Sequence, residues 1–331
     1  RSISVSNPIK LTTFQPKHLP ALVAFLNRAL AGHRHWTAIS EADFTERVLS
    51  QPGFDPEGLI LAQVQGRGAT GEIVGGIHAV KPIVSTPGYR SSEARHHIAW
   101  LAVLPEYRGR KLGGALLDEA ETYLYYCPMY FAAQNAPFYG IIEKLWVPWY
   151  GSTERMGVSA VNDKALVSWL NLRGYQVTDP GDVSMSAHLH HRERPEDPGL
   201  ARRGLCIEPI NEQNPWTGDE PFYQLRTWGH NGGRKYQGLV VADGNRAVGS
   251  AVWYPLPDTL TAALAWIGLD RPYRGLRYGS YLLDRALADM ANRGYLAVEV
   301  HVHSKDNVEA FSLLRRRGFE VIDYWVNLVK T

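Results

Sequence analysis

An internal repeat constrains this chain more than any other feature of its sequence. Residues 99–118 (AWLAVLPEYRGRKLGGALLD) align without gaps on residues 265–284 (AWIGLDRPYRGLRYGSYLLD), and nine of the twenty positions are identical. Chance would give about one identity, so the chain contains two copies of one supersecondary unit. The copies lie 166 residues apart in a chain of 331, which predicts two domains of ordinary size.

A second match follows the first. Residues 167–175 (VSWLNLRGY) correspond to residues 311–319 (FSLLRRRGF), so the first copy carries 22 extra residues, which we place in the aromatic stretch 130–159. Residues 190–203 mix charges with proline and glycine, a composition typical of a solvated linker. We therefore expect an N-terminal domain over residues 1–190, a linker over 191–203 and a C-terminal domain over 204–331.

Both halves show the same order of predicted elements. In the first half we expect helices at 20–31 and 112–125 and strands at 59–64, 73–80 and 97–103. In the second half we expect strands at 204–209, 239–242, 247–254, 261–269, 296–303 and 321–329, and helices at 220–230, 278–293 and 307–317. Strands alternating with helices in this way predict an α/β fold with a mixed sheet. Trp100 and Trp266, on the central strands, are expected in the core.

Bulk composition excludes several classes of protein. No apolar run is long enough to span a membrane, and 35 basic against 33 acidic residues give no indication of a nucleic-acid partner. The two cysteines, Cys127 and Cys206, have no metal-ligand or CxxC spacing, and the first residues lack the apolar core of a secretory signal. We expect a soluble, cytoplasmic protein with free thiols and no metal site.

The chemistry that the repeat carries lies directly after its central strand. An apolar strand leads into a turn with Arg108 and Gly109, and glycines then open an amphipathic helix. A helix N-terminus offers unpaired N–H groups and a partial positive charge, and glycine lets a phosphate approach the backbone closely. One such turn could be an ordinary strand-to-helix connection with a surface arginine. Two turns in the same register indicate a pyrophosphate site.

These segments resemble the acyl-CoA-binding motif R/Q-x-x-G-x-G/A of the GNAT acetyltransferase superfamily. Its fourth position is usually glycine, but here it is Lys111 or Arg277, which is compatible with a helical first turn and could pair with a phosphate or be a solvated charge. A second family signature, N-x-x-A-x-x-L-Y-x-x-x-G-F, matches residues 307–319 except at Leu314, where the family has tyrosine. In the first copy Asp163 and Leu170 replace the asparagine and the tyrosine.

The resemblance implies two tandem GNAT folds and acetyl transfer from acetyl-CoA to a primary amine of a small molecule or peptide by direct attack. It also implies that the central strands pair with pantetheine, that the loops hold the pyrophosphate and that an asparagine binds the amide arm of the cofactor. The residues expected to bind acetyl-CoA are Leu101, Val103, Arg108, Gly109, Arg110, Lys111, Gly113, Gly114, Ile267, Leu269, Arg274, Gly275, Arg277, Gly279, Ser280 and Asn307.

Proton transfer needs other residues, because the leucines at the tyrosine positions cannot serve. Strand alternation places Glu299, His301 and His303 on one face, and histidine titrates near neutral pH, so these three are the candidate acid and base residues. The alternative is a polar strand edge facing solvent. In the first copy the corresponding candidates are Glu93, His96 and His97, with the same alternative.

We expect the second copy to be the catalytic one, because it keeps more of the family signatures. A different class of function, an acyl-CoA sensor with little or no turnover, is favoured by the two missing tyrosines. A third, an aminoacyl transferase of the peptidoglycan-bridge type, is disfavoured by the two intact loops, since such enzymes draw their acyl group from charged tRNA.

Overall fold

The computed structural model describes residues 9–34, 36–51, 53–66, 71–82, 96–125, 128–131, 138–139, 157–190, 195–210, 237–256 and 259–331. The chain forms two compact units: the first holds Arg1–Tyr150, Arg155–Asp179 and Trp325–Thr331, and the second holds Gly151–Glu154 and Pro180–Tyr324. These limits differ from the boundaries at 190 and 204 expected from the repeat, because the first unit includes strand residues after 324 and the second unit includes strand residues before 190.

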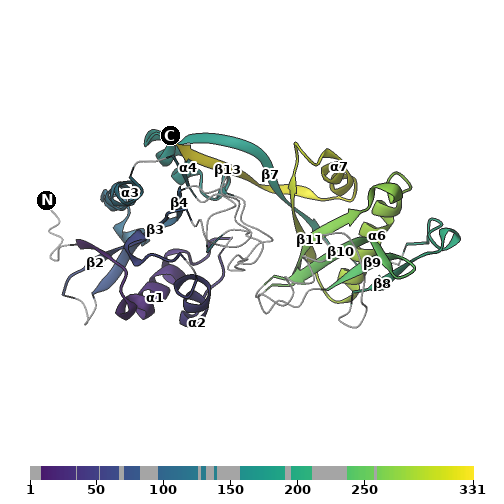
Figure 1. Ribbon diagram of the computed structural model, residues 1–331, viewed down its shortest axis with the longest axis horizontal. Coiled ribbons are helices and arrows are strands. Elements are labelled where there is room, and N and C mark those ends of the chain that lie inside the picture. Colours follow the sequence, from purple (N-terminus) through teal and green to yellow (C-terminus); the bar gives the residue numbers. More distant parts are fainter. Residues whose placement is uncertain are drawn as a thin grey trace. The chain divides into compact units, whose positions relative to one another are not determined.

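Within the described residues, the first unit is built on a mixed sheet with the strand order β1-β2-β3-β4-β5-β13, in which β4 and β5 are parallel and the other neighbours are antiparallel. Figure 1 labels β2, β3, β4 and β13 of this sheet. Its strands are β1 (Ile9–Thr13), β2 (Leu59–Val64), β3 (Glu72–Val80), β4 (His96–Val103), β5 (Met129–Phe131), β6 (Val158–Ser159), which pairs with β13, and the ends of β7 (Gln176–His188) and β13 (Glu320–Lys330). Its helices are α1 (Leu19–Ala29), α2 (Glu41–Phe44), α3 (Leu112–Tyr123) and α4 (Lys164–Leu172), with short turns at Pro16–His18, Thr45–Leu49, Pro56–Gly58 and Pro105–Tyr107.

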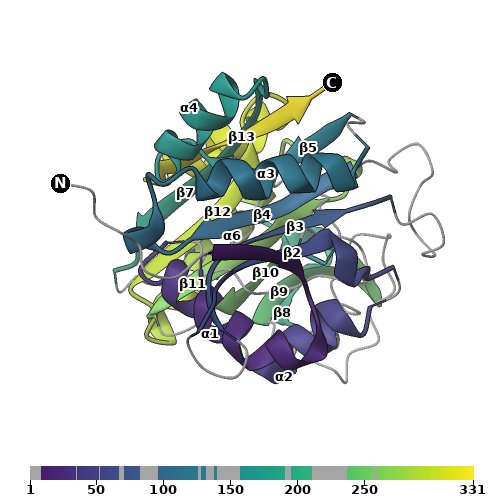
Figure 2. The same cartoon turned by 90° about the vertical axis from the view of Figure 1, so that its left-hand side faces the viewer.

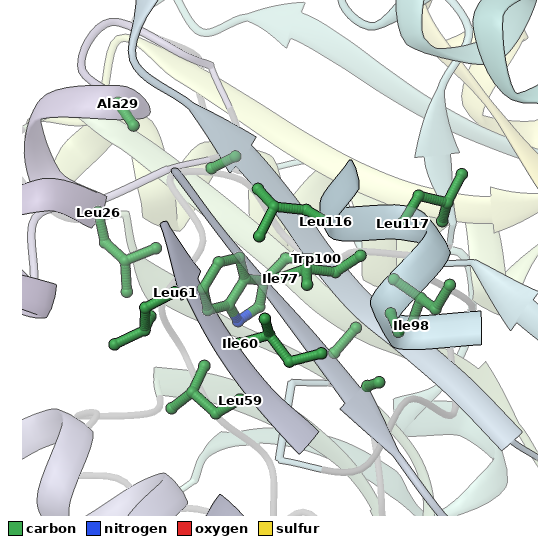
Figure 3. Close-up of a cluster of buried hydrophobic side chains, with 14 of the residues drawn as sticks. Leu26, Ala29, Leu59, Ile60, Leu61, Ile77, Ile98, Trp100, Leu116 and Leu117 are labelled. Atoms are coloured by element: carbon green, nitrogen blue, oxygen red, sulfur yellow. The ribbon is translucent and has the colours of Figure 1, made fainter. Parts of the chain in front are cut away.

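Helices cover both faces of this sheet, with α3 on one side and α1 and α2 on the other (Figure 2). Two adjacent glycines of β3 show why. A side chain at Gly75 would meet Leu112 and Leu116 of α3, whereas one at Gly76 would meet Trp100 and Leu61 on the opposite face. Figure 3 shows Leu116 and Leu117 of α3 and Leu26 of α1 among the buried side chains of this core. The packing on both faces of the sheet is so close here that a side chain at either glycine would force its neighbours to shift.

The second unit repeats this plan with the strand order β8-β9-β10-β11-β12-β7, in which only β11 and β12 are parallel. Its elements are a short turn at Ala201–Arg203, β8 (Leu205–Pro209), β9 (Gln237–Asp243), β10 (Arg246–Pro255), β11 (Thr261–Leu269), a turn at Arg271–Tyr273, α6 (Tyr278–Asn292), β12 (Ala297–His303) and α7 (Val308–Arg316). Helix α6 packs on β9, β10 and β11. The hairpin between β9 and β10 turns at Gly244, which has a φ of 57°.

The expected α/β fold with a mixed sheet is confirmed in both halves. The helix expected at 220–230 and most of the insertion expected at 130–159 lie outside the described residues. Among the helices that the structure describes, none is long and apolar enough to cross a membrane.

One ion pair recurs in both units at repeated positions. Asp284 of α6 accepts two hydrogen bonds from Arg317, of 2.6 and 2.9 Å, and this pairing raises the pKa of the arginine. In the first unit the matching residues, Asp118 and Arg173, also form a salt bridge. Each pair joins the helix after the central strand to the end of the following helix, which explains why the sequence repeats these aspartates.

The last strand of the chain completes the sheet of the first unit. Residues 328–330 of β13 pair antiparallel with β5, and Lys330 Nζ lies 2.7 Å from the buried Glu121 carboxylate of α3. The other oxygen of Glu121 accepts a 3.0 Å hydrogen bond from the Tyr175 hydroxyl. Burial and the Glu121 charge raise the pKa of Tyr175, which keeps it a donor. Tyr175 and Lys330, which are far apart in the sequence, thus both bind the buried carboxylate of Glu121.

Replacement of Lys330 by methionine is expected to lower the free energy of unfolding by about 1–3 kcal/mol, because the Glu121 carboxylate stays buried without its cation. The double variant K330M/E121Q should recover part of this loss, because it no longer buries an unpaired charge. Urea unfolding measures both, with the exposed Lys164→Met as the control. Equal stability of K330M and wild type would contradict this role of the last strand.

Candidate functional site

A β-bulge at the same repeated residue bends both central strands. In β4 the pairing with β3 passes from His78–Trp100 to Ala79–Ile98, which leaves Ala99 extra. In β11 the pairing with β10 passes from Val252–Trp266 to Trp253–Leu264, which leaves Ala265 extra. A bulge bends its strand and ends regular pairing on one side. The alanines that begin the twenty-residue repeat therefore mark the bend.

Beyond the bulge in the second unit, the central strand separates from its parallel neighbour. The pairing of β11 with β12 ends at Leu264–Val300, although β12 continues to His303. Residues 267–269 still pair with β10 on their other side. On the side of β11 that faces away from β10, the backbone N–H and C=O groups of Ile267 and Leu269 therefore have no strand partner. In the first unit β4 pairs with β5 over His96–Ile98, and the chain beyond β5 lies outside the described residues.

The loop after each central strand is held by its arginine in the same way in both units. Arg108 Nε donates to the Val103 carbonyl at 2.9 Å, and Arg274 Nε donates to the Leu269 carbonyl at 2.7 Å. This contact uses one nitrogen and leaves the two terminal nitrogens of each guanidinium for a ligand. Gly109 and Gly275 follow with φ values of 74° and 78°, a conformation that favours glycine.

The structure corrects the expected conformation of Lys111 and Arg277. They do not belong to a helical first turn: they are the N-cap residues of α3 and α6, with φ values of 63° and 66°. The family's glycine at this position has a physical reason, since a left-handed conformation costs a residue with a side chain about 1 kcal/mol. Both copies accept this strain to place an exposed cation where the helix begins.

The start of each helix has room for a ligand. A Cβ on Gly113 would meet only Val103 at 4.0 Å, and one on Gly279 would meet only Leu269 at 3.6 Å, so the protein itself does not demand glycine there. The first N–H groups of α3 and α6 have no carbonyl partner within their helices. Unpaired donors, exposed cations and small residues together fit a pyrophosphate.

Helix α7 and helix α4 begin differently. Asn307 Oδ1 accepts a 3.3 Å hydrogen bond from the Ala310 N–H and so caps α7, which leaves its NH₂ group able to donate. At the repeated position Asp163 makes no cap, and its Oδ1 lies 3.1 Å from His33 Nε2. The first copy has a carboxylate where the second has a neutral amide.

The candidate proton-transfer residues share one face of β12, opposite the apolar core formed by Val298, Val300 and Val302. Glu299 is 4% exposed, so it does not belong to a solvent-facing strand edge. The side chain of His301 is 5% exposed and that of His303 is 39% exposed. Their neighbours across the strand pairing are Ser186, Ser184 and Asp182 of β7.

Sequence analysis missed Asp182. Its Oδ1 lies 3.3 Å from His301 Nε2 and 2.7 Å from His303 Nδ1, and its side chain is 3% exposed. Asp182 lies in the range expected to form the N-terminal domain, residues 1–190, and no repeat or motif links it to β12. Only the pairing of β7 with β12 brings it to these histidines.

The first-copy candidates are less closely assembled. His97 is buried against Tyr130, with ring centroids 6.0 Å apart, and burial lowers the pKa of His96. Glu93 lies outside the described residues.

Comparison with known proteins decides the family. The acetyltransferase (GNAT) family matches residues 29–126 and 206–319, one region in each half and together more than half of the chain. The chain belongs to this family. Acetyl-CoA is the acetyl donor of GNAT acetyltransferases, and the two matched regions make this chain a tandem member.

Individual relatives agree with this assignment. A mycothiol acetyltransferase of Beutenbergia cavernae is 35% identical over 81 residues, which are 24% of this chain and 27% of the relative. A GCN5-related N-acetyltransferase of Sphaerobacter thermophilus matches 98% of this chain and 96% of its own with a TM-score of 0.56 and 16% identity. A tandem GNAT protein from the clavulanic acid biosynthesis pathway matches 97% of this chain over 98% of its own length, with a TM-score of 0.61 and 16% identity. The structural matches show the fold, and the curated relative is matched over about a quarter of its length.

The two central tryptophans have different surroundings. Trp100 is 8% exposed, as expected, but Trp266 is 38% exposed, so the expectation that it is a core residue is wrong. Trp266 lies on the opposite face from the core contacts of Ile267 and Leu269, and its indole covers Gly268. Trp266 and Glu299 lie on the same face of the sheet. Leu264 and Val300 pair with each other and point into the core, so the neighbouring pair, Ala263 and Glu299, points to the opposite face.

In the first unit the matching face of the sheet is filled by the chain's own side chains. His78 is 1% exposed, stacks on Phe138 with planes 13° apart, and lies 2.8 Å from the Tyr139 hydroxyl through Nδ1. It also meets Trp100 edge-on. Burial lowers the pKa of His78 to about 3. Phe138 and Tyr139 are described residues of the stretch in which we place the 22-residue insertion.

The neutral state of His78 predicts a pH dependence of stability. The unfolded chain takes up this proton near pH 6.5, whereas the folded chain does so near pH 3. This contribution to stability is therefore complete above about pH 6.5 and is lost as the pH falls, by up to about 1.4 kcal/mol per pH unit. His78→Phe should flatten the decline in free energy of unfolding between about pH 6 and about pH 4.

Urea unfolding at several pH values measures this slope. The matched control is the exposed His188→Phe, which should keep the wild-type slope. The same slope in H78F and wild type would contradict a buried neutral His78.

Proposed function

We propose that the chain acetylates a primary amine of a small molecule or peptide and that the second copy is the catalytic one. The observation that carries this proposal is the separation of β11 from β12 beside the Arg274 loop. A free strand edge suits an extended ligand arm that carries amides, and the adjoining loop suits its pyrophosphate. When bound there, acetyl-CoA supplies a thioester that is open to attack by an amine.

Each part of the second site has a role in this proposal. The backbone of Ile267 and Leu269 binds pantetheine and orients the acetyl group, and the NH₂ group of Asn307 donates to the amide arm. The loop residues Arg274, Gly275, Arg277, Gly279 and Ser280 hold the pyrophosphate. Glu299, His301 and His303 are the candidates for removal of the proton from the acceptor ammonium.

Three features favour the second copy over the first. Asp163 puts a negative charge where Asn307 offers a donor, which disfavours an anionic ligand. The aromatic cluster around His78 fills the face of the first sheet that corresponds to the exposed Trp266. The polar face that β12 shares with β7 combines the carboxylates of Glu299 and Asp182 with two histidines, which suits a cationic amine. In the first copy, the matching residues of β4, of the loop and of the start of α3 are proposed to bind acetyl-CoA without turnover: Leu101, Val103, Arg108, Gly109, Arg110, Lys111, Gly113 and Gly114.

The first test is release of free thiol from acetyl-CoA by the full-length chain, measured with and without polyamines, aminoglycosides, amino acids and peptides. Release that depends on an amine supports the transferase. Binding of acetyl-CoA in calorimetry, without release for any amine, would favour the acyl-CoA sensor. Failure to bind any acyl-CoA would exclude both. Isolated domains cut at residues 190 and 204 are unsuitable here, because β5 and β12 each pair with a strand on the other side of that cut.

The cations at the helix starts separate the two copies. Asparagine tolerates the left-handed conformation but removes the charge, so Arg277→Asn should leave the fold intact and raise KM for acetyl-CoA about tenfold, equivalent to about 1.4 kcal/mol. The matched variant Lys111→Asn makes the same change in the first copy and should leave kcat and KM unchanged.

Steady-state kinetics of both variants provide the readout. A rise in KM in K111N, with none in R277N, would assign catalysis to the first copy. Unchanged KM in both would show that these cations do not bind the cofactor.

A further inference from the structure

The buried polar face of the second unit contains a contact that the proposed roles leave unused. His301 is nearly fully buried, and its Nδ1 has no hydrogen-bond partner within the described part of the protein. Its Nε2 lies 3.3 Å from Asp182 Oδ1. A buried imidazole nitrogen without a partner costs free energy, so the presence of this one calls for an explanation, and a catalytic role is one.

The place of His301 in the sheet supports such a function. Pairing between β11 and β12 ends at Val300, and His301 is the next residue, so its backbone lies where the two strands begin to separate. Its side chain shares the face of Glu299, opposite the valine core. A group at this position lies next to the strand edge on which the acetyl donor is proposed to bind.

Resting on the proposed function, we propose that Asp182 is a positioning residue that holds His301 as the general base of the second site. The carboxylate accepts a hydrogen bond from Nε2–H, which fixes the tautomer in which Nδ1 carries the free electron pair. Its negative charge then stabilises the imidazolium that forms when Nδ1 takes a proton. A residue from the range expected to form the N-terminal domain thus belongs to the site of the second unit.

The reaction balances with these groups. His301 Nδ1 takes one proton from the acceptor ammonium and leaves a neutral amine. The amine nitrogen forms a bond with the acetyl carbonyl carbon, the carbon–sulfur bond breaks, and the thiolate leaves with its electron pair. The second proton lost from nitrogen matches the one needed to convert the thiolate to a thiol. The imidazolium then releases its proton to solvent, which gives amide, free thiol and one proton in total.

His303 shares the same carboxylate oxygen at 2.7 Å, although its Nδ1 is not aligned for a hydrogen bond. Its side chain is 39% exposed, whereas that of His301 is 5% exposed. Asp182 therefore lies between a buried imidazole and one that reaches water. We assign the base to the buried member, because only there does exclusion of water strengthen the interaction with the carboxylate.

Kinetics of the full-length chain test whether Asp182 acts through His301. Asp182→Asn preserves shape and should lower kcat roughly 100-fold while KM for acetyl-CoA stays within about twofold. His301→Gln should lower kcat to a similar degree. The double variant D182N/H301Q should be no slower than H301Q alone, because two residues that act as one unit are not additive. His188→Gln, which makes the same change at an exposed histidine of β7, is the matched control and should retain wild-type kcat.

The outcomes separate the two proposals. An active wild type in which D182N keeps its kcat, or in which the two losses multiply, would overturn the role of Asp182 and leave the transferase intact. A wild type without amine-dependent thiol release would instead overturn the transferase.

A measurement on the unmodified protein tests the pairing even if D182N does not fold. In ¹⁵N spectra of the histidine-labelled chain, assigned with H301Q, the neutral form of His301 should carry its proton on Nε2. A neutral ring with its proton on Nδ1 would overturn the assignment.

Discussion

The antiparallel pairing of β12 with β7 is the interaction on which the second unit depends. It joins Ala297–His303 to residues 182–188, seven residue pairs between strands encoded more than a hundred positions apart. On one face the pairing buries Val183, Met185 and Ala187 with the valines of β12. On the other it brings serines and Asp182 to Glu299 and the histidines. One set of backbone hydrogen bonds thus builds both the core and the candidate site, because side chains alternate along each strand.

The bulges provide the second constraint. An unbroken β11 could pair with β12 along its whole length, and its backbone groups would then be satisfied within the sheet. The extra residue Ala265 ends that pairing and leaves an edge that a ligand can complete. The Arg274 side chain holds the Leu269 carbonyl at the end of the strand, so the edge and the anion loop keep a fixed relation. Preorganisation of this kind lowers the entropy lost on binding.

Much of this arrangement follows from the sequence, because the repeat marks what both copies need. The bulge alanines, the loop arginines and the aspartates of the recurrent ion pair all fall within the twenty aligned residues. The left-handed conformation of Lys111 and Arg277 escaped prediction, since local sequence favours helix there and only the turn geometry requires a positive φ. Asp182 escaped because pairing between distant strands leaves no local pattern. The exposure of Trp266 could not be predicted, because a strand shows the same alternating sequence pattern whether or not its second face is covered by other side chains.

The pairing of β13 with β5 also bears on the order in which the protein can fold. A chain leaves the ribosome from its N-terminus, and domains ordinarily fold as they emerge. Here β5 has to wait for residues 328–330, which are synthesised almost 200 positions later, and Glu121 waits with it for Lys330. The first unit therefore closes only after residues 180–324 of the second unit have been synthesised. Until residues 328–330 emerge, β5 exposes an unpaired strand edge, a feature that promotes aggregation.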